Sequence, residues 1–402
     1  MLKRTHRFGV LSLLAVASLL VSACDNTSST PAPQTGPTAT PTTDNRVEAK
    51  IGFAFVTSGD NATYGVAQKA AAELAIVEIN ALDDGPRLEA IFEDTASDPD
   101  QALAVFKKLI GIDNVDAIIG PTLSNEAKTA DPEAQTAGVP VLAVSNTATG
   151  ITDIGDYIFR DSLAEAQVIP ETIKQAKDEL HISKVVLMYA SDDAFSKSGA
   201  DVFRAELQKQ NIEILGEQTF STSDTDFKTQ LAAAKAMTPD AIVVSALINP
   251  AKLITRQARN DAGISAKTYI IGGNGFNSPS LITSAGTASE GIVVGSAWNL
   301  ASSDQLSQQF VTNYKKAAGK DPDQFAAQSY AGVYIMYDAI KRANIKDKSL
   351  KDARTAIRDA LKSTSNHPTV LGNFSFTDKR DADHPPVVQV VRNGKFELLK
   401  QK

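Results

Sequence analysis

Short apolar runs alternate with longer helical stretches through most of the chain. The apolar run 50–56 is followed by a helical stretch over about 64–80, and the same order of strand and helix recurs as far as the run 269–271. In the first helical stretch, apolar residues recur at spacings of three and four, which predicts one buried helix face made of Val66, Ala70, Leu74, Val77 and Ala81. Strands that alternate with helices in this way indicate parallel sheets with helices on both faces.

The strand–helix rhythm restarts after Arg160, which indicates two layered lobes in tandem rather than one large sheet. Later in the chain, helical stretches at about 304–317, 324–343 and 350–362 come in succession, before strands near 370–376, 387–391 and 396–399. Consecutive helices without intervening strands are typical of segments that cover sheets already built. We therefore expect this tail to be shared between the two lobes.

The first residues have the pattern of a secretory signal peptide. Lys3, Arg4 and Arg7 precede an apolar run, 8–20, of 13 residues, which is too short to span a bilayer comfortably, and small residues then lead into Cys24. The ending before Cys24 resembles the bacterial lipobox, and this resemblance implies cleavage after residue 23 and a lipid on the Cys24 sulfur. The alternative is an ordinary signal peptide with an incidental cysteine.

Residues 24–46 contain mostly Thr, Pro and Ser after the cysteine. Such a segment cannot bury enough apolar area to offset the entropy of ordering it, so we predict a disordered tether. With the signal peptide at 1–23, this tether would keep the folded body near a membrane surface and within reach of an embedded partner.

Composition excludes several classes of function. The 402 residues carry a net charge of −7, and loss of the three basic leader residues Lys3, Arg4 and Arg7 would take it to −10. A chain this acidic is a poor nucleic-acid binder, because affinity for phosphate rests on Lys and Arg. With a single cysteine, no intrachain disulfide can form, and with only four histidines we expect neither a metal site nor a cofactor.

The ligand site is expected at the carboxyl ends of the parallel strands. That rule selects the loops 57–63, 120–123, 145–149, 190–195 and 272–276. Neutral hydrogen-bonding side chains gather there: Ser58, Thr122, Ser124, Ser145, Asn146, Thr147 and Thr149. Several precede predicted helices, whose free N–H groups favour an anion, so the cluster suits the carboxylate of a small molecule. Each residue alone is equally explained as a helix cap.

Signals for catalysis are weak in comparison. Ser124 does not sit in a G-x-S-x-G turn, and no histidine lies in a strand-end loop to act as its base. The glycines at 272–275 lack the spacing of a dinucleotide-binding loop. Asp192 and Asp193 would contact a cation or cap a helix. We therefore expect a binding protein rather than an enzyme.

Segments spread along the chain together resemble the type I periplasmic binding proteins of the leucine/isoleucine/valine-binding group, which serve ABC importers. The matching segments are Ile51-Gly52-Phe53 with Tyr64-Gly65, Glu93-Asp94-Thr95 with Asp98-Pro99, Ile119-Gly120-Pro121 before Ser124, Gly138-Val139-Pro140-Val141 before Ser145-Asn146-Thr147, Phe159-Arg160, Asp226-Phe227, Arg256-Gln257-Ala258-Arg259 and Gly372-Asn373-Phe374 with Phe376. Each segment alone is weak, whereas their order over about 350 residues makes the resemblance specific.

The resemblance implies an α/β fold of two doubly wound parallel-sheet lobes joined by three crossovers. Residues 47–162 and 299–372 would form the N-terminal lobe, and residues 163–298 and 373–402 the C-terminal lobe. Carried over by position, Ser124, Ser145 and Thr147 would hold the ligand α-carboxylate, or in part its α-amino group, from the first lobe. Tyr64 would line the same wall.

The second lobe would close over the ligand with Phe195 and Leu247. The family often has an acidic residue at the position of Asn274, where it meets the ligand ammonium, so this departure puts a standard amino acid in doubt unless Asp193 compensates. Trp298, the only tryptophan, would pack on the ligand side chain or in the core of the hinge.

The function implied is capture of a small carboxylate-bearing solute outside the cytoplasm, with a branched-chain or other aliphatic amino acid as the first choice. The partners would be an ABC permease with its ATPase subunits, and the membrane through the lipid on Cys24. Amides, urea-like solutes and aromatic acids remain alternative ligands. A ligand-sensing module and a two-lobed α/β enzyme remain alternative functions.

Overall fold

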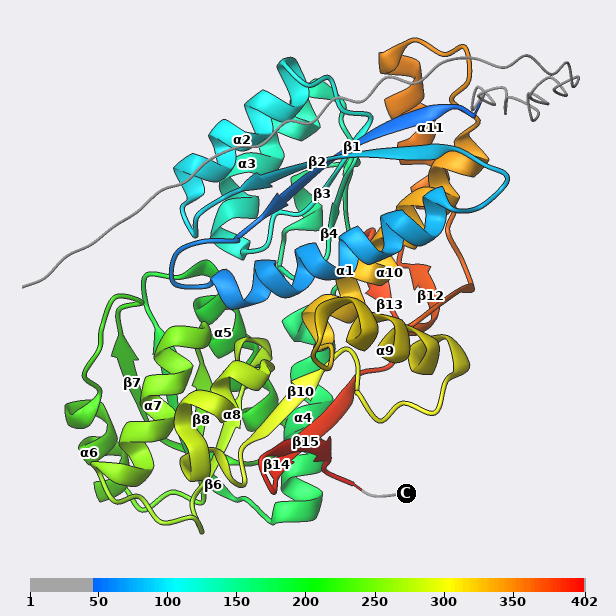
Figure 1. Cartoon of the computed structure of the whole chain (residues 1–402). Coiled ribbons are helices and arrows are strands. Elements are labelled where there is room, and N and C mark those ends of the chain that lie inside the picture. The colour runs from blue at the N-terminus through cyan, green and yellow to red at the C-terminus, as the bar shows by residue number, and fades with distance from the viewer. Residues whose placement is uncertain (1–45, 401–402) are drawn as a thin grey trace, which may run out of the picture. The chain divides into compact units, whose positions relative to one another are not determined.

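The computed structural model describes residues 46–400. The predictions for the signal peptide, for Cys24 and for all of the tether except Arg46 fall outside the described residues. Within them the two-lobed α/β fold is confirmed (Figure 1).

The first lobe is built on a five-stranded parallel sheet in the order β2-β1-β3-β4-β5. Its strands are β1 (Glu48–Phe55), β2 (Arg87–Asp94), β3 (Ala117–Ile119), β4 (Val141–Ala143) and β5 (Ile158–Arg160). Ile51, Phe53 and Phe55 point to one face and pack against helices α1 (Ala62–Asn80), α10 (Gln324–Ala343) and α11 (Leu350–Lys362). Ala54 and Ile118 on the other face pack against α2 (Pro99–Gly111) and α3 (Ser124–Ala137).

The second lobe has a seven-stranded sheet in the order β15-β14-β10-β9-β8-β6-β7, in which only β14 runs opposite to the other strands and pairs antiparallel with both β10 and β15. Its strands are β6 (Lys184–Ala190), β7 (Glu213–Phe220), β8 (Ala241–Ser245), β9 (Tyr269–Gly272), β10 (Val293–Ser296), β14 (Val387–Arg392) and β15 (Lys395–Leu398). Both faces are apolar, because helices cover both. These helices are α4 (Glu165–Leu180) and α5 (Ala194–Lys209) on one face, and α6 (Lys228–Ala236), α7 (Ile248–Asn260) and α8 (Pro279–Ala285) on the other.

The chain crosses between the lobes three times: from β5 to α4, from β10 to α9 (Gln305–Ala318), and from the small sheet of β11 (His367–Thr369), β12 (Gly372–Phe376) and β13 (Ala382–Asp383) to β14. Arg160, at the end of β5 before the first crossover, donates from Nε to Oδ1 of the partly exposed Asp381, just before β13, at 2.5 Å. Arg160 also donates to the carbonyl oxygen of Ala148 at 2.8 Å. Charge-assisted hydrogen bonds therefore hold together first-lobe segments that lie near two of the points where the chain leaves that lobe.

The sequence-based lobe boundary differs from the packing at one end. Residues 373–402 were expected in the second lobe, but Phe374 and Ala382 pack in the core of the first lobe beside Phe159 and Phe53. The short strands that carry them pair only with each other, so they are free to follow the first lobe. We propose that the boundary lies between β13 and β14.

The buried face predicted for the first helix is wrong. Val66 is 45% exposed and Val77 is 67% exposed, whereas α1 buries Ala67, Ala71 and Ala75 instead. The helix is rich in alanine, so spacings of three and four occur on more than one face. The face with the smallest side chains is the buried one, because it lets α1 pack closely along α10.

Candidate ligand-binding site

A narrow cavity of about 20 Å³ lies between the lobes, at the carboxyl ends of the strands. The first lobe contributes Tyr64, Thr122, Leu123, Ser124, Ser145, Asn146, Thr147 and Phe325, and the second contributes Phe195, Leu247, Asn274 and Gly275. None of these twelve residues is charged.

Seven of the nine residues expected to bind ligand come together here: Tyr64, Ser124, Ser145, Thr147, Phe195, Leu247 and Asn274. They come from strand-end loops and helix starts in both lobes, as the rule for parallel sheets predicts. Asp193 and Trp298 lie outside this lining, and their surroundings give each a different role.

Asp193 caps α5 and joins the two lobes at the edge of the cleft. Its Oδ2 accepts hydrogen bonds from the Ser196 backbone N–H at 2.7 Å and the Ser196 hydroxyl at 2.8 Å. Its Oδ1 accepts from the Asn125 amide on α3 at 3.0 Å, and the Ala194 N–H donates to the Asn125 Oδ1 at 2.9 Å. Burial raises the pKa of the carboxyl. Asp193 therefore contacts the opposite lobe and does not replace an acid at position 274.

Trp298 is 5% exposed and lies in the core near the second crossover. Its indole N–H donates to the Ser307 hydroxyl at 2.8 Å, and its ring meets Phe310 edge to face with centroids 6.0 Å apart. These contacts agree with the hinge-core alternative for this residue rather than with packing on a ligand.

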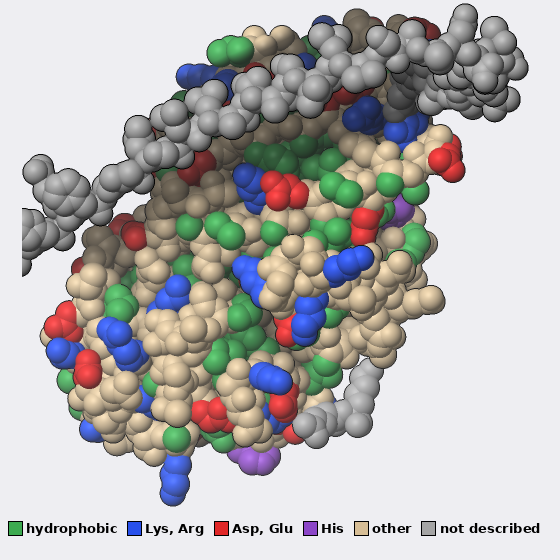
Figure 2. Space-filling view, viewed as in Figure 1, with side chains coloured by type: hydrophobic (Ala, Val, Ile, Leu, Met, Phe, Trp, Pro, Cys, Tyr) green, Lys and Arg blue, Asp and Glu red, His purple; other side chains and the backbone are tan. Residues whose placement is uncertain are grey.

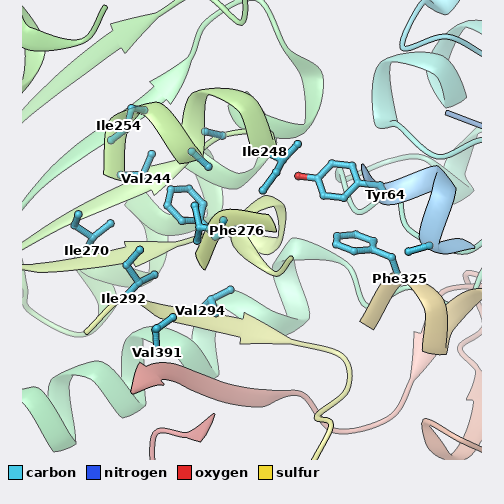
Figure 3. Close-up of a cluster of buried hydrophobic side chains, with 14 of the residues drawn as sticks. Tyr64, Val244, Ile248, Ile254, Ile270, Phe276, Ile292, Val294, Phe325 and Val391 are labelled. Carbon is cyan, nitrogen blue, oxygen red and sulfur yellow. The ribbon is translucent and has the colours of Figure 1, made fainter. Parts of the chain in front are cut away.

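Tyr64 and Phe325 form an aromatic wall of the cavity, of which only Tyr64 was predicted from the sequence. Their ring centroids are 4.4 Å apart, and the Tyr64 hydroxyl points away from α1 toward Ile248 of the second lobe (Figure 3). Phe325 was missed because it opens α10, far along the chain from every strand-end loop. Burial raises the pKa of Tyr64 well above its usual value, so the hydroxyl keeps its proton.

The lobes touch directly around the cavity. The Tyr64 hydroxyl donates to the Gly275 carbonyl oxygen at 2.7 Å, and the Thr149 N–H donates to the Ser198 hydroxyl at 2.8 Å. These two contacts between the lobes make the structure a closed arrangement of the cleft. Within the second lobe, a Cβ at Gly275 would lie 2.1 Å from the carbonyl oxygen of Ala246, so the segment that meets Tyr64 has no room for a larger residue.

The polar side chains of the first-lobe wall are held by one another. Gln68 of α1, which sequence analysis missed, donates to the Ser145 Oγ at 2.8 Å and accepts from the Thr122 hydroxyl at 2.7 Å. Ser145 in turn donates to the Thr122 carbonyl oxygen at 2.7 Å. Ser124 Oγ accepts from the Ala148 N–H at 3.2 Å, and its own hydrogen is directed to no described residue. The sequence did contain a signal for Gln68, because it is a polar residue among the alanines of the buried face of α1.

Glu165 is a second residue that sequence analysis missed. It begins α4 at the first crossover and is 1% exposed. Thr147 donates its hydroxyl hydrogen to Glu165 Oε1 at 2.9 Å, while Oε2 has no hydrogen-bond partner. Burial raises the pKa of the carboxyl to about 7, although the hydrogen bond from Thr147 opposes that shift. Glu165 lies behind the wall and sets the direction of the Thr147 hydroxyl.

Asn274 stands on the second-lobe wall, in the short helix η2 (Asn274–Phe276). Its Oδ1 accepts a hydrogen bond from the side-chain amide of Gln324. The Gln324 Oε1 accepts from the Ala297 backbone N–H at 2.9 Å and from the Asn277 amide at 2.8 Å. The orientation of Asn274 is therefore set from behind by a chain of amides.

Other kinds of site find little support. Across residues 46–400, no group of His, Cys, Asp and Glu is placed to hold a metal ion. In the same range, no helix is both long and apolar enough to cross a membrane. On the face shown in Figure 2, Lys and Arg side chains are interspersed with Asp and Glu rather than gathered in a basic surface.

Comparison with known proteins follows this geometry. A family model described as periplasmic binding protein matches residues 48–395. The leucine-, isoleucine-, valine-, threonine-, and alanine-binding protein of Pseudomonas aeruginosa is 26% identical over 336 residues, which cover 83% of this chain and 86% of that protein.

Solved structures agree with the fold. The branched-chain amino acid transporter substrate-binding protein of Streptococcus pneumoniae, in complex with isoleucine, is 30% identical with a TM-score of 0.80, over 87% of this chain and 98% of that one. A solute-binding protein of an ABC transporter from R. palustris, in complex with benzoate, is 20% identical with a TM-score of 0.79, over 88% and 95% of the two chains, a likeness in fold alone. The resemblance predicted from the sequence is confirmed, and the chain belongs to the periplasmic binding protein family, the substrate-binding proteins of ABC transporters.

Proposed function

We propose that this protein captures a small carboxylate-bearing solute between its lobes and delivers it to an ABC permease. The observation that carries the proposal is the position of Ser124. It begins α3 at the wall of the cavity, and no residue between 46 and 400 accepts its hydroxyl hydrogen. The unpaired N–H groups of the first helical turn and this hydroxyl together form a neutral anion site.

The mechanism is a shift between open and closed lobes and involves no bond breaking. A ligand that touches Ser124 on one lobe and Asn274 or Phe195 on the other makes both sets of contacts only when the cleft is closed. Such a ligand stabilises the closed population by its differential affinity for that state. The closed form is the one that we propose is presented to the permease.

Branched-chain or other aliphatic amino acids and aromatic acids are the two candidate ligand classes. The ligands in the names of the similar proteins, branched-chain amino acids in some and benzoate in another, all carry a carboxylate. The apolar lining of Leu123, Phe195, Leu247 and Phe325 suits an apolar remainder of either kind. The uncharged lining favours the second class, because it offers no acid to an ammonium group.

Thermal melting of the purified full chain against amino acids, amides, urea and organic acids tests the proposal. A ligand at 100 times its dissociation constant adds about 2.7 kcal/mol of stability, which raises the melting temperature by a few degrees. A shift with any carboxylate that Ser124→Ala removes would support the proposal. Shifts confined to amides or urea, or none at all, would contradict it.

We also propose that Cys24 carries the lipid that holds the protein at the outer side of the membrane. The lipobox-like ending before Cys24 supports this proposal, and one lipid signal alone gives weak anchoring, so two or more acyl chains are needed. In bacteria that express the Cys24→Ser variant, the protein is expected in the soluble exported fraction, whereas the unaltered chain sediments with membranes. Sedimentation of both forms alike would exclude Cys24 as the anchor.

A further inference from the structure

We propose that the site selects carboxylates that present a hydrogen-bond acceptor, and no ammonium group, to Asn274, so that 2-oxo acids bind better than the matching 2-amino acids. This inference rests on the proposed function, since it assumes that a small carboxylate occupies the cavity. The supporting observation is the direction of the hydrogen bonds among three side-chain amides, those of Asn274, Gln324 and Asn277.

The orientation of Gln324 is fixed by a group that can only donate. The Ala297 backbone N–H lies 2.9 Å from the Gln324 Oε1, which identifies that atom as the oxygen. The Asn277 amide nitrogen also donates to it, and Asn277 is itself oriented by the carbonyl oxygen of Gly295. The nitrogen of the Gln324 side chain must therefore face Asn274.

The orientation of Asn274 follows from that of Gln324. An amide nitrogen has only donors, so the Asn274 atom that meets it must be the carbonyl oxygen. The oxygen of Asn274 is thus occupied from behind, and its NH₂ group makes no hydrogen bond to any residue between 46 and 400. Because Asn274 lines the cavity, the second-lobe wall offers a ligand two hydrogens there.

The first-lobe wall offers one free donor. No residue between 46 and 400 accepts the hydroxyl hydrogen of Ser124, whereas the oxygens of Ser145 and Thr122 already accept hydrogen bonds from Gln68 and from the backbone of Val56. The acceptor left on this wall is the Oδ1 of Asn146, which is buried without a partner. An ammonium group brings three hydrogens that all need acceptors, and it would meet the NH₂ of Asn274 donor against donor. A ligand with acceptors at both ends satisfies Ser124 and Asn274 together.

Glu165 is the one acid that would argue for an ammonium. It is not part of the lining, and the hydroxyl of Thr147 stands between its Oε1 and the cavity. An ammonium held by Thr147 in the field of Glu165 is thus the arrangement that competes with this proposal, and it predicts the opposite order of affinities.

Calorimetric titration of the full chain with matched ligand pairs distinguishes the two. The pairs are 4-methyl-2-oxopentanoate with leucine, and phenylglyoxylate with phenylglycine, so that a poor fit of one side chain does not hide the effect. We expect the oxo acid of at least one pair to bind about tenfold or more tightly than its amino partner, the effect of one hydrogen bond made instead of opposed.

Asn274→Asp is the decisive variant. It keeps an oxygen for Gln324 and replaces the NH₂ by a charged acceptor, so the preference within each pair should reverse by about 10- to 100-fold toward the amino acid. Ser124→Ala is the matched control, because it should weaken both members of a pair alike.

The outcomes separate this inference from the proposed function. Equal or tighter binding of the amino acids by the unaltered protein, or an unchanged preference in Asn274→Asp, would overturn the inference while leaving carboxylate capture intact. If neither pair and no other acid bound, the proposed function itself would fail.

Discussion

The hydroxyl of Tyr64 donates a 2.7 Å hydrogen bond to the carbonyl oxygen of Gly275, 211 residues later in the chain, and so joins the two lobes across the cavity. Any movement of the lobes apart would break this contact. The same Tyr64 ring packs on Phe325 within the first lobe, so one side chain both shapes the wall and contacts the opposite lobe.

Tyr64→Phe should weaken ligand binding by about three- to tenfold, the value of one hydrogen bond, while keeping the ring contact with Phe325. Calorimetric titration with the acid that gives the largest melting shift measures this effect. Tyr314→Phe is the matched control, since the Tyr314 hydroxyl is buried without a hydrogen-bond partner and lies outside the cavity lining. Equal affinity of the Tyr64 variant and the unaltered protein would show that the contact does not stabilise the closed form.

Asn125→Ala should speed ligand release without touching the ligand. The variant loses two hydrogen bonds across the cleft, to Asp193 and from Ala194, so the closed form should open about 5- to 30-fold more readily. Stopped-flow fluorescence of the single tryptophan follows dissociation. Gln230→Ala, which removes a hydrogen bond inside the second lobe, should leave the rate unchanged. The same rate in both variants would count against Asn125 as a closing contact.

Gly275→Ala should displace the part of the second-lobe wall that meets Tyr64. The added Cβ would lie 2.1 Å from the carbonyl oxygen of Ala246 in the same lobe, a distance that requires the backbone to move, and Gly275 itself accepts the hydrogen bond of Tyr64. Ligand affinity is expected to fall by tenfold or more, on the order of the 1–3 kcal/mol cost of overpacking. Gly111→Ala, where a Cβ would meet nothing within 4 Å, provides the control. Normal affinity in Gly275→Ala would mean that ligand binding does not depend on the backbone position of Gly275.

Glu165→Gln should flatten the pH dependence of stability. The folded-state pKa of Glu165 is raised to about 7 from an ordinary 4.5, so between these values the folded form keeps a proton that the unfolded form has lost. Stability from this group is present below about pH 4.5 and is lost as the pH rises to 7, by roughly 3 kcal/mol in total.

Denaturant unfolding at pH 5 and pH 8 measures that loss. The difference in unfolding free energy between the two pH values should be smaller in Glu165→Gln than in the unaltered protein. Glu126, whose pKa burial raises to about 8, contributes in the same direction to both proteins, so the comparison isolates Glu165. Glu171→Gln on the same helix serves as the control. An identical pH dependence in Glu165→Gln would contradict the shifted pKa.

Local pattern predicted the elements well where packing agreed with it. An aspartate before a proline, as at Asp98 and Pro99, is typical of a helix start, and Asp98 Oδ1 accepts hydrogen bonds from the N–H groups of Asp100 and Gln101 at the start of α2. The pattern failed for the face of α1, because an alanine-rich helix has several faces of similar hydrophobicity and the choice depends on the distant α10.

The sequence indicated where the candidate site residues lie, but not which of them present hydrogen-bond donors and which present acceptors to the cavity. Strand-end loops placed Ser124, Ser145 and Asn274 correctly around one cavity. An asparagine read from sequence is both donor and acceptor, however, and only contact with Gln324, 50 residues later, decides which group it shows. Asp193 was expected to compensate for Asn274 at the ligand. Sequence could not show that Asp193 instead pairs with Asn125 of the other lobe, because that contact depends on how far the lobes close.

The three crossovers also determine when this protein can fold. The first lobe takes α10 and α11 from the later part of the chain, and the second sheet is completed by β14, which pairs with β10 only after residue 387 has been made. Neither lobe is complete in an N-terminal fragment of the chain, and contacts this distant in sequence form slowly. We therefore expect both lobes to reach their final packing only late in synthesis, and a chain that folds late stays for longer in an extended state.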